Sequence, residues 1–321
     1  MNTAKKRYNL YSQYLKNKYG QKVYKLPINL TTTCPNRDGT LSVDGCIFCD
    51  ESGSGFENLP NIMPVEEQIS RNKEYIRKHY GAKKFIAYFQ TYTNTYMPVN
   101  KFKEYISRVW QEDIVEIAIS TRPDCIDEIY MDFLEEFSEK SGVNISIELG
   151  LQTVNYHTLK KINRGHTLAE FIDGALMVKK RGFHLCAHLI LNLPWDDCDD
   201  VVENAKILSA LGIDSVKLHS LYIIKGTPLG EMYQEGKIKI ITMDEYIDRV
   251  ITFLEYLDPG IVIQRLIGRA PEKHALFVNW GTSWWKIRDR IEEEMETRDT
   301  YQGKRFNYLN GRAIKGFYQS Q

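Results

Sequence analysis

The middle of the chain alternates short apolar runs with segments in which apolar residues recur at helical spacing. The apolar runs predict buried strands at 27–32, 85–90, 115–120, 144–151, 183–191 and 215–222. The segments between them predict helices near 64–79, 100–111, 126–139, 167–181 and 198–210. Repeated strand–helix units favour a parallel sheet with right-handed crossovers. The pattern therefore predicts an α/β fold, a partial (β/α)6 TIM-like barrel.

The flanks of this pattern differ from its middle. Residues 261–266 are a candidate for one more strand, and the chain from about 271 looks helical, with Trp280, Trp284 and Trp285 expected to pack in the core. Neither a linker nor an internal repeat interrupts the pattern. We therefore expect one barrel at 25–270, preceded by a basic aromatic extension at 1–24. A C-terminal helical extension with a basic tail is expected at 271–321.

Three cysteines follow the first predicted strand with the spacing C-x(11)-C-x(2)-C: Cys34, Cys46 and Cys49. Three thiolates on one loop can hold three irons of a [4Fe–4S] cluster and leave the fourth iron for a ligand such as S-adenosylmethionine (SAM). Zinc would normally require a fourth ligand, and the nearest histidine, His79, is thirty residues away in a charged helical stretch. A disulfide cannot use three cysteines. Arg37, within the loop, would offset the negative charge of a cluster.

Polar residues stand at the ends of the second, third and fourth predicted strands, where a barrel gathers its ligands. Glu148 is a charge inside an apolar strand, so it has either a ligand or a structural ion-pair partner. Gly150 would let another group approach the backbone closely. Arg164, a little further on, could bind a carboxylate with its planar fork, or be an exposed capping residue.

The fifth and sixth predicted strands place further candidates on one face each. His184, Cys186 and His188 share a face, and we favour a polar barrel lining over a metal triad. Lys217 and His219 share a face too, and either could contact substrate or act as acid or base, although a satisfied core histidine is an equal alternative. Cys125 and Cys198 are both expected near the same end of the barrel, where one could donate a hydrogen atom. These four residues, Lys217, His219, Cys125 and Cys198, are the catalytic candidates.

Net charge is zero, with 42 basic and 42 acidic residues, but both ends of the chain are basic. Residues 1–25 hold seven basic and no acidic residues, and 298–321 hold five basic residues against one acidic residue. Aromatic residues are interleaved with them: Tyr8, Tyr11, Tyr14, Tyr19, Tyr24, Tyr301, Phe306, Tyr308, Phe317 and Tyr318. This composition is typical of RNA binding, and the alternative is terminal helices whose tyrosines pack on the barrel. Apolar runs long enough for a membrane span and the features of a signal peptide are both missing, so we expect a cytoplasmic protein.

The cysteine loop and the strand ends resemble the radical SAM superfamily, and specifically its YhcC/YtqA-like group. That group carries the loop C-P-N-R-D-G-T…G-C-x-x-C, which begins here at Cys34, and the segment F-Q-x-Y-T-N-T-Y, which begins at Phe89. Residues 24–270 are also similar to the radical SAM domain of the Elongator catalytic subunit. The shared motifs lie at 121–124, 148–152, 163–167, 188 with 193–194, 225–229 and 264–265. Several motifs in one order are more specific than any one of them.

The resemblance implies a [4Fe–4S] cluster on Cys34, Cys46 and Cys49 with SAM on its open iron. Reduction by an external donor of the flavodoxin or ferredoxin type would then cleave SAM and give a 5′-deoxyadenosyl radical. By the same resemblance, the methionyl amino group of SAM meets a turn in place of the family's glycine-rich motif. The residues implied for the SAM pocket are Gln90, Thr91, Ser120, Glu148, Gln152 and Arg164.

Elongator's domain acts on the wobble uridine of tRNA, and an RNA substrate suits the basic aromatic ends. We therefore expect a radical SAM enzyme of the transferase or lyase type that modifies tRNA at the wobble uridine side chain. One rival function is the same chemistry on a small molecule or peptide. The other is a cluster-bearing RNA-binding protein without turnover.

Overall fold

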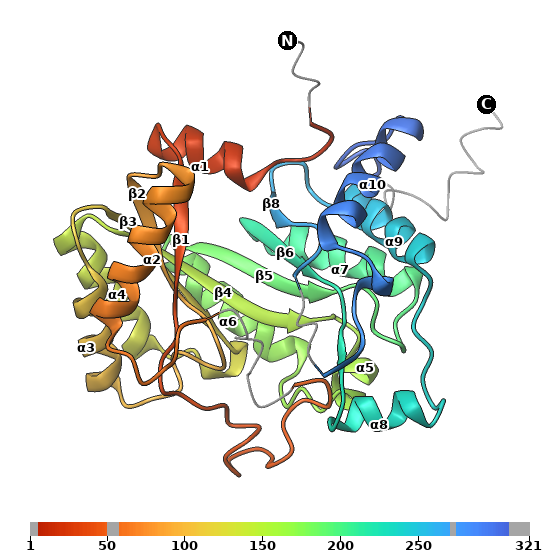
Figure 1. Ribbon diagram of the computed structural model, residues 1–321, viewed down its shortest axis with the longest axis horizontal. Coiled ribbons are helices and arrows are strands. Elements are labelled where there is room, and N and C mark those ends of the chain that lie inside the picture. Colours follow the sequence, from red (N-terminus) through yellow and green to blue (C-terminus); the bar gives the residue numbers. More distant parts are fainter. Residues whose placement is uncertain (1–5, 50–57, 270–273, 308–321) are drawn as a thin grey trace, which may run out of the picture.

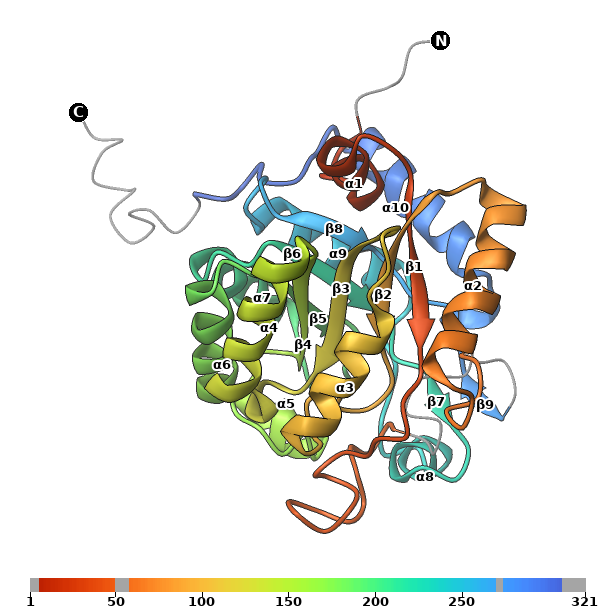
Figure 2. The ribbon, with the colours of Figure 1, turned by 90° about the vertical axis from the view of Figure 1, so that its left-hand side faces the viewer.

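Seven parallel strands form one sheet, which curls into an open half-barrel in the computed structural model (Figures 1 and 2). The structure describes residues 6–49, 58–269 and 274–307. In sheet order the strands are β1 (Val23–Ile28), β2 (Lys84–Phe89), β3 (Ile114–Thr121), β4 (Asn144–Gln152), β5 (His184–Ile190), β6 (Ser215–His219) and β8 (Val262–Arg265). The predicted partial α/β barrel is confirmed, and 261–266 does supply an additional strand, β8.

Helices cover the outer face of the sheet (Figure 2). They are α2 (Val65–Tyr80), α3 (Val99–Val109), α4 (Glu128–Ser141), α6 (Leu168–Lys180), α7 (Cys198–Ala210) and α9 (Met243–Tyr256). Local sequence sets their ends: capping boxes at Thr167 and Asp197 begin α6 and α7, and Gly142, with φ of 72°, ends α4. Among the described residues, no helix has the length and apolar character that a membrane span requires.

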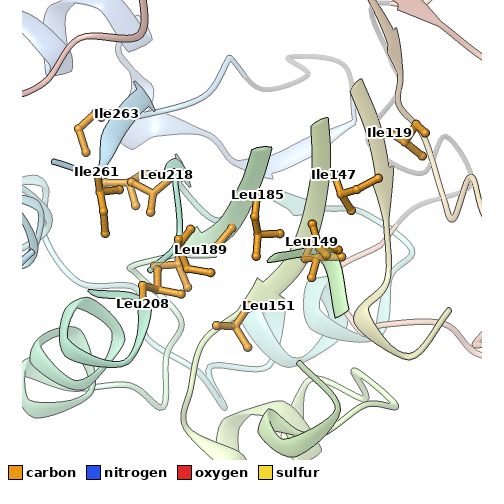
Figure 3. Packing of buried hydrophobic residues seen from close by; sticks show 14 of the residues in the cluster. Ile119, Ile147, Leu149, Leu151, Leu185, Leu189, Leu208, Leu218, Ile261 and Ile263 are labelled. Carbon is orange, nitrogen blue, oxygen red and sulfur yellow. The ribbon is translucent and has the colours of Figure 1, made fainter. Parts of the chain in front are cut away.

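Side chains on one face of the sheet pack in the hydrophobic core, and those on the other face point toward the barrel interior. On β4, Ile147, Leu149 and Leu151 are fully buried against the helices (Figure 3), whereas Glu148 and Gly150 face the barrel interior. This alternation follows from the two-residue period of a strand. Packing of the apolar face therefore fixes the position of the side chains that face the interior.

The helix α1 (Tyr11–Tyr19) lies at the end of the barrel where the strands begin and contacts both edge strands, β1 and β8 (Figure 1). A bridge between Leu10 and Ile263 and a hydrogen bond of 2.8 Å from Lys25 Nζ to Gln264 Oε1 also join the two edges. On the far side, α10 (Trp284–Thr297) packs against α9. The N-terminal segment therefore closes the barrel at the end opposite the cysteine loop.

Tyrosines of the N-terminal segment pack on the barrel. The hydroxyl groups of Tyr8 and Tyr19 donate to Glu292 and Glu116, each at 2.7 Å, and Tyr14 meets His184. Tyr24 stacks on Tyr80 with ring centroids 4.9 Å apart. The packing alternative thus describes these tyrosines better than an RNA-binding surface does.

Much of the N-terminal charge is also neutralised within the protein. Ion pairs join Lys6 to Glu292, Arg7 to Asp299, Lys18 to Glu116 and Lys25 to Glu148. Several residues of the basic aromatic ends lie outside the described residues: Lys5, Tyr308, Arg312, Lys315, Phe317 and Tyr318.

The first strand begins and ends four residues earlier than the apolar run suggested, at Val23–Ile28 instead of 27–32. The ladder stops because the Gln68 side chain takes both backbone groups of Asn29: its Oε1 accepts from the amide and its Nε2 donates to the carbonyl, each at 2.9 Å. The pattern also missed α5 (Tyr156–Lys161), α8 (Pro228–Gln234), α9 and the small strand β7 (Ile223–Ile224).

The helix expected from about 271 begins only at Trp284, because Ala275–Phe277 forms the strand β9, which pairs with β7. Trp280 and Trp284 pack against the core as expected, but 46% of Trp285 is exposed. The expectation that all three tryptophans are core residues is therefore wrong for Trp285.

Candidate functional site

A cavity of about 270 Å³ opens at the end of the barrel where the parallel strands end. The three loop cysteines and the six candidate SAM-binding residues all line it, together with Lys217 and His219. Strand ends from β2 to β8 and the cysteine loop contribute to its wall. The topology brings these residues together because all the strands are parallel and end at the same side.

The cysteine loop folds back on itself through backbone hydrogen bonds. The amide of Arg37 donates to the Cys34 carbonyl at 2.8 Å, and the amide of Cys49 donates to the Cys46 carbonyl at 2.9 Å. Ile47 anchors the loop to the barrel: its amide donates to the Ile162 carbonyl after α5, and its carbonyl accepts from Leu229 on α8. Two helices that the sequence did not predict, α5 and α8, therefore position the cysteines.

Cationic and amide donors point at the buried sulfur atoms. Arg122 Nη1 lies 3.9 Å from Cys34 Sγ, and Arg164 Nη1 and Asn36 Nδ2 each lie 3.8 Å from Cys46 Sγ. Burial opposes the charge of Arg122, but hydrogen bonds and the ion pair with Asp124 outweigh it and raise the pKa of the guanidinium. The site therefore favours anionic sulfur.

Three residues on the cavity wall have strained backbone. Thr91, Tyr92 and Gln152 have φ of 85°, 52° and 76°, in the left-handed region that side chains other than glycine rarely adopt. For a β-branched residue such as Thr91 this is a clear outlier, and strain of about 1–3 kcal/mol per residue is characteristic of ligand sites. Two of these residues, Thr91 and Gln152, are candidate SAM contacts.

Arg164 reaches the cavity across Gly150. Its Nη2 donates to the Gly150 carbonyl at 2.7 Å, and a Cβ on Gly150 would lie 2.8 Å from the same nitrogen. Because Gly150 has no side chain, the Arg164 guanidinium can lie against its backbone. This is the close approach predicted at Gly150. Arg164 is buried, so the alternative of an exposed capping arginine is excluded.

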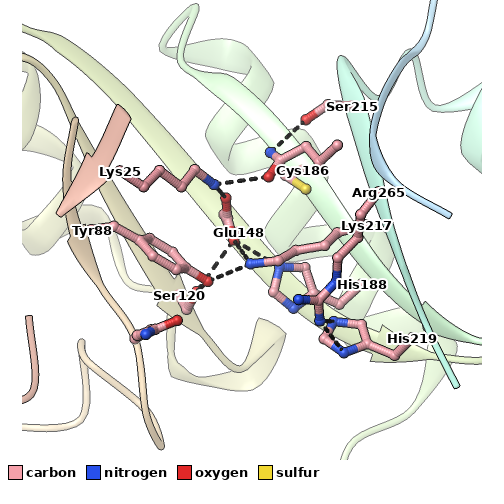
Figure 4. Close-up of polar contacts among 12 residues, drawn as sticks. Lys25, Tyr88, Ser120, Glu148, Cys186, His188, Ser215, Lys217, His219 and Arg265 are labelled. Carbon is pink, nitrogen blue, oxygen red and sulfur yellow. Dashed lines mark hydrogen bonds and ion pairs between the residues drawn. The ribbon is translucent and has the colours of Figure 1, made fainter. Parts of the chain in front are cut away.

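Glu148 is fully buried at the centre of a polar network inside the barrel (Figure 4). Its Oε1 pairs with Lys25 at 2.5 Å, and its Oε2 lies 2.8 Å from His188 Nε2 and 3.2 Å from Lys217 Nζ. Burial alone would raise the pKa of Glu148, but Lys217, Lys25 and His188 outweigh it and hold that pKa well below its usual value. Of the two alternatives that the sequence left open, Glu148 therefore has the structural ion-pair partners. It also lines the cavity, where a ligand would bind.

The bases around Glu148 bind protons weakly. Burial, opposed by Glu148, lowers the pKa of Lys217 to about 7, and burial together with Lys217 lowers that of His188 to about 4. Burial and the neighbouring Arg265 hold the pKa of His219 well below its usual value. Lys217 can therefore exchange a proton near neutral pH, whereas the two histidines are neutral acceptors or donors.

Of the other candidates, His188 lines the cavity, whereas Cys125, Cys198, His184 and Cys186 are not among its lining residues. Cys198 is exposed at the start of α7. His184 bonds to Ser215 at 2.9 Å, away from Cys186 and His188. Cys186 and His188 do lie near Glu148, but Lys25 and Lys217 occupy the carboxylate oxygens, which favours a polar lining over a metal site.

Sequence reasoning missed Tyr88 and Lys25 as members of this site. The Tyr88 hydroxyl accepts from Lys217 at 2.7 Å and meets Ser120 at 2.9 Å. The sequence pattern predicts the first strand after Lys25, so it groups Lys25 with the basic N-terminal residues. With β1 at its true position, Lys25 alternates with the buried Leu26 and Ile28, and that alternation was the available signal.

Comparison with known proteins supports this geometry. Residues 28–208 match the sequence model of the Radical SAM superfamily, and residues 213–297 match that of the Radical_SAM C-terminal domain. The chain is 35% identical over 307 residues to the uncharacterized protein YtqA of Bacillus subtilis, covering 95% of each chain. It is 26% identical over 162 residues to the tRNA uridine(34) acetyltransferase of Methanocaldococcus jannaschii, which is 48% of this chain and 28% of that one.

The fold has a solved counterpart in the archaeal Elp3 of Methanocaldococcus infernus. The TM-score is 0.64 at 17% sequence identity, over 87% of this chain and 64% of that one. At this identity the likeness concerns the fold alone.

Proposed function

The chain belongs to the radical SAM superfamily, and on this premise we propose that it is a tRNA-modifying enzyme whose cavity holds both cofactors. The family's cofactors are a [4Fe–4S] cluster and SAM. One observation carries the proposal: the three cysteines and the six candidate cofactor residues line a single cavity at the strand ends.

The residues around the cysteines fit an anionic iron–sulfur group. Arg122 and Arg164 direct guanidinium groups at the sulfur atoms of Cys34 and Cys46, which compensates negative charge and stabilises thiolates. Asn36 Oδ1 and Arg164 Nε are buried without a hydrogen-bond partner among the described residues. Such atoms are expected where a ligand supplies the missing contact. Cys34, Cys46 and Cys49 would hold three irons.

The wall beside the cysteines fits SAM. Gln90 and the strained Thr91 offer polar groups just after β2, and Ser120 offers its hydroxyl from β3. Gln152 does so from the end of β4, and Arg164 from the loop after α5. In this assignment Arg164 would bind the methionyl carboxylate with its planar fork, and the turn at Thr91 would hold the amino group. Glu148 would complete the pocket from the middle of β4.

When bound and reduced by a flavodoxin- or ferredoxin-type donor, the cluster supplies the electron that cleaves SAM to a 5′-deoxyadenosyl radical. The protein's own part is to hold the reactants and exclude water. Ile190 and Leu221 are buried apolar residues of the cavity wall. Lys217 Nζ, with its pKa of about 7, can accept or release a proton beside the cavity at neutral pH. The exposed thiol of Cys198 has no direct part in this assignment.

Two observations support tRNA as the substrate. One is the name of a distant relative, a tRNA uridine(34) acetyltransferase, which matches part of this chain. The other is a basic aromatic rim beside the cysteine loop. On the exposed side of α5, the ammonium groups of Lys160 and Lys161 lie 4.6 and 5.6 Å from the ring centroids of Tyr156 and Trp195. Cations beside aromatic rings suit the phosphates and bases of RNA. This rim is at the cavity end of the barrel, unlike α1.

The test is anaerobic reconstitution with reductant, SAM and tRNA from cells that lack the gene. We expect 5′-deoxyadenosine whose yield rises with tRNA, and a mass change in one tRNA nucleoside. Cys34→Ser should abolish both, and Cys198→Ser should retain them. With the cluster intact, no 5′-deoxyadenosine above background would contradict the enzyme and leave a cluster-bearing RNA-binding protein. A yield independent of tRNA would favour a small-molecule or peptide substrate.

A further inference from the structure

Arg265, at the end of β8, is a cation of the cavity wall that has no carboxylate partner among the described residues. Its Nε donates to the Leu218 carbonyl at 3.3 Å, and its Nη2 contacts both ring nitrogens of His219, at 2.5 and 3.1 Å (Figure 4). Within the described part of the chain, its Nη1 makes no hydrogen bond. One edge of the guanidinium therefore remains available to a ligand in the cavity.

The charges around Arg265 do not balance. Glu148 is the carboxylate of the cavity wall, and it already accepts from Lys25, Lys217 and His188. Lys217 can release its proton near neutral pH, but a guanidinium does not deprotonate in proteins. A partly buried Arg265 without a counter-ion carries an unfavourable desolvation cost that a bound anion would offset.

The backbone of the neighbouring loop packs closely against the Arg265 side chain. The backbone at Gly268 lies over the guanidinium, and a Cβ there would lie 3.0 Å from Nη2 and 3.1 Å from Cζ of Arg265. The Gly268 carbonyl accepts from Asn279 Nδ2 at 3.3 Å, and Asn279 Oδ1 accepts from the Ser220 hydroxyl at 2.6 Å. His219, kept neutral by burial and by Arg265, is an acceptor for the guanidinium and does not compete with it for an anion.

The geometry points to an anion-recognition subsite at Arg265, on the cavity wall formed by β6 and β8, that binds a carboxylate or phosphate group of the substrate. A guanidinium with an open edge matches the planar, paired oxygens of either group. The subsite lies on β6 and β8, whereas Arg164, the residue assigned to SAM, lies in the loop between α5 and α6. The identity of the substrate that carries the anion rests on the proposed function. If the substrate is tRNA, the anion is a phosphate beside the target nucleotide.

The experiment measures binding of inorganic phosphate and of acetate to the reconstituted holoenzyme with SAM bound and no reductant, by isothermal titration calorimetry. We expect binding to the wild type and roughly ten- to hundredfold weaker binding to Arg265→Gln, the range that loss of a charged hydrogen bond gives. Arg265→Lys should fall between them because it keeps the charge and loses the fork. The matched control is Arg290→Gln, which removes an arginine from a surface ion pair and should bind like the wild type.

Gly268→Ala keeps the guanidinium but displaces it, so it should also weaken anion binding even if Arg265→Gln does not fold. Stronger binding of phosphate identifies a phosphate group, and stronger binding of acetate identifies a carboxylate. Absence of binding by both anions, or equal binding by wild type and Arg265→Gln, would overturn the subsite. So would SAM affinity that falls with anion affinity in Arg265→Gln, because Arg265 would then serve SAM. Phosphate binding through Arg265 without tRNA binding would keep the subsite and reject the tRNA proposal.

Discussion

Lys25 and Glu148 form a 2.5 Å ion pair between β1 and β4, two strands that are not neighbours in the sheet. The contact crosses the barrel interior, and the same ammonium also donates to Gln264 on the opposite edge strand, β8. One lysine thus joins both edges of the open sheet to its central strand. The stability of the barrel and the position of Glu148 in the cavity wall are therefore coupled.

Glu148→Gln should lower the free energy of unfolding by about 3–5 kcal/mol, because it leaves buried lysine ammonium groups without their counter-ion. Urea unfolding of the anaerobic holoenzyme measures this. Glu104→Gln is the matched control: that carboxylate is 63% exposed in a pair with Arg108, and its loss should change stability by no more than about 0.5 kcal/mol. Similar small losses for both variants would contradict the central role of Glu148.

The pKa of Lys217, lowered to about 7 mainly by burial, predicts a pH-dependent stability. Unfolded lysine titrates near 10.4, so above pH 7 the unfolded chain holds a proton that the folded chain has released. The free energy of unfolding then rises with pH, by up to about 1.4 kcal/mol per unit. We expect the stability of the wild type minus that of Lys217→Met to increase from pH 7 to 9 in urea titrations. A difference that is flat or falls would contradict the lowered pKa.

Two glycines with similar backbone conformations allow a controlled test of the packing around the cysteine loop. Gly165 and Gly182 have φ of 78° and 66°, so alanine at either position costs about 1 kcal/mol in stability. A Cβ on Gly165 would also lie 2.2 Å from Asn36 Oδ1 and 3.1 Å from Arg122 Nη2, whereas at Gly182 nothing lies within 4 Å. Gly165→Ala should therefore lower the iron and sulfide bound per chain, and Gly182→Ala should not. Equal cofactor content in both would show that the Asn36 contact is dispensable.

How much of this site the sequence could predict depends on the kind of signal. The cysteines, Gln90, Glu148 and Arg164 were predictable, because spacing and strand ends are local features and parallel topology brings strand ends together. The pairing of Lys25 with Glu148 was not, because it depends on how far the sheet curls. Cys125 and Cys198 follow β3 and β5 at the expected end of the barrel, but neither lines the cavity, because following a strand does not by itself turn a side chain toward it.

Arg164→Gln should lower the reduction potential of the cluster by an amount on the order of tens of millivolts. The guanidinium, 3.8 Å from Cys46 Sγ, stabilises added negative charge. A charged hydrogen bond is worth about 1.5–3 kcal/mol, or about 65–130 mV for one electron, and only the part that differs between the two oxidation states shifts the potential. Redox titration followed by electron paramagnetic resonance measures the shift. Arg71→Gln, on the surface of α2, should leave the potential unchanged. An unchanged potential in Arg164→Gln with full iron content would mean that this guanidinium does not act on the cluster.

Two lysine pairs at opposite ends of the barrel allow the two possible RNA-binding surfaces to be tested separately. Lys160 and Lys161 are exposed on α5 beside the cysteine loop, and Lys16 and Lys22 are exposed near α1, at the far end. Because RNA must reach the cavity, reversal of Lys160 and Lys161 to glutamate should weaken tRNA binding. It should also reduce the slope of log affinity against log salt by roughly one per lysine that contacts phosphate. The same change at Lys16 and Lys22 should leave both quantities near the wild-type values. Filter binding across a salt series measures them, and the reverse ranking would place the RNA on α1, away from the cavity, and reject the proposed route to the active site.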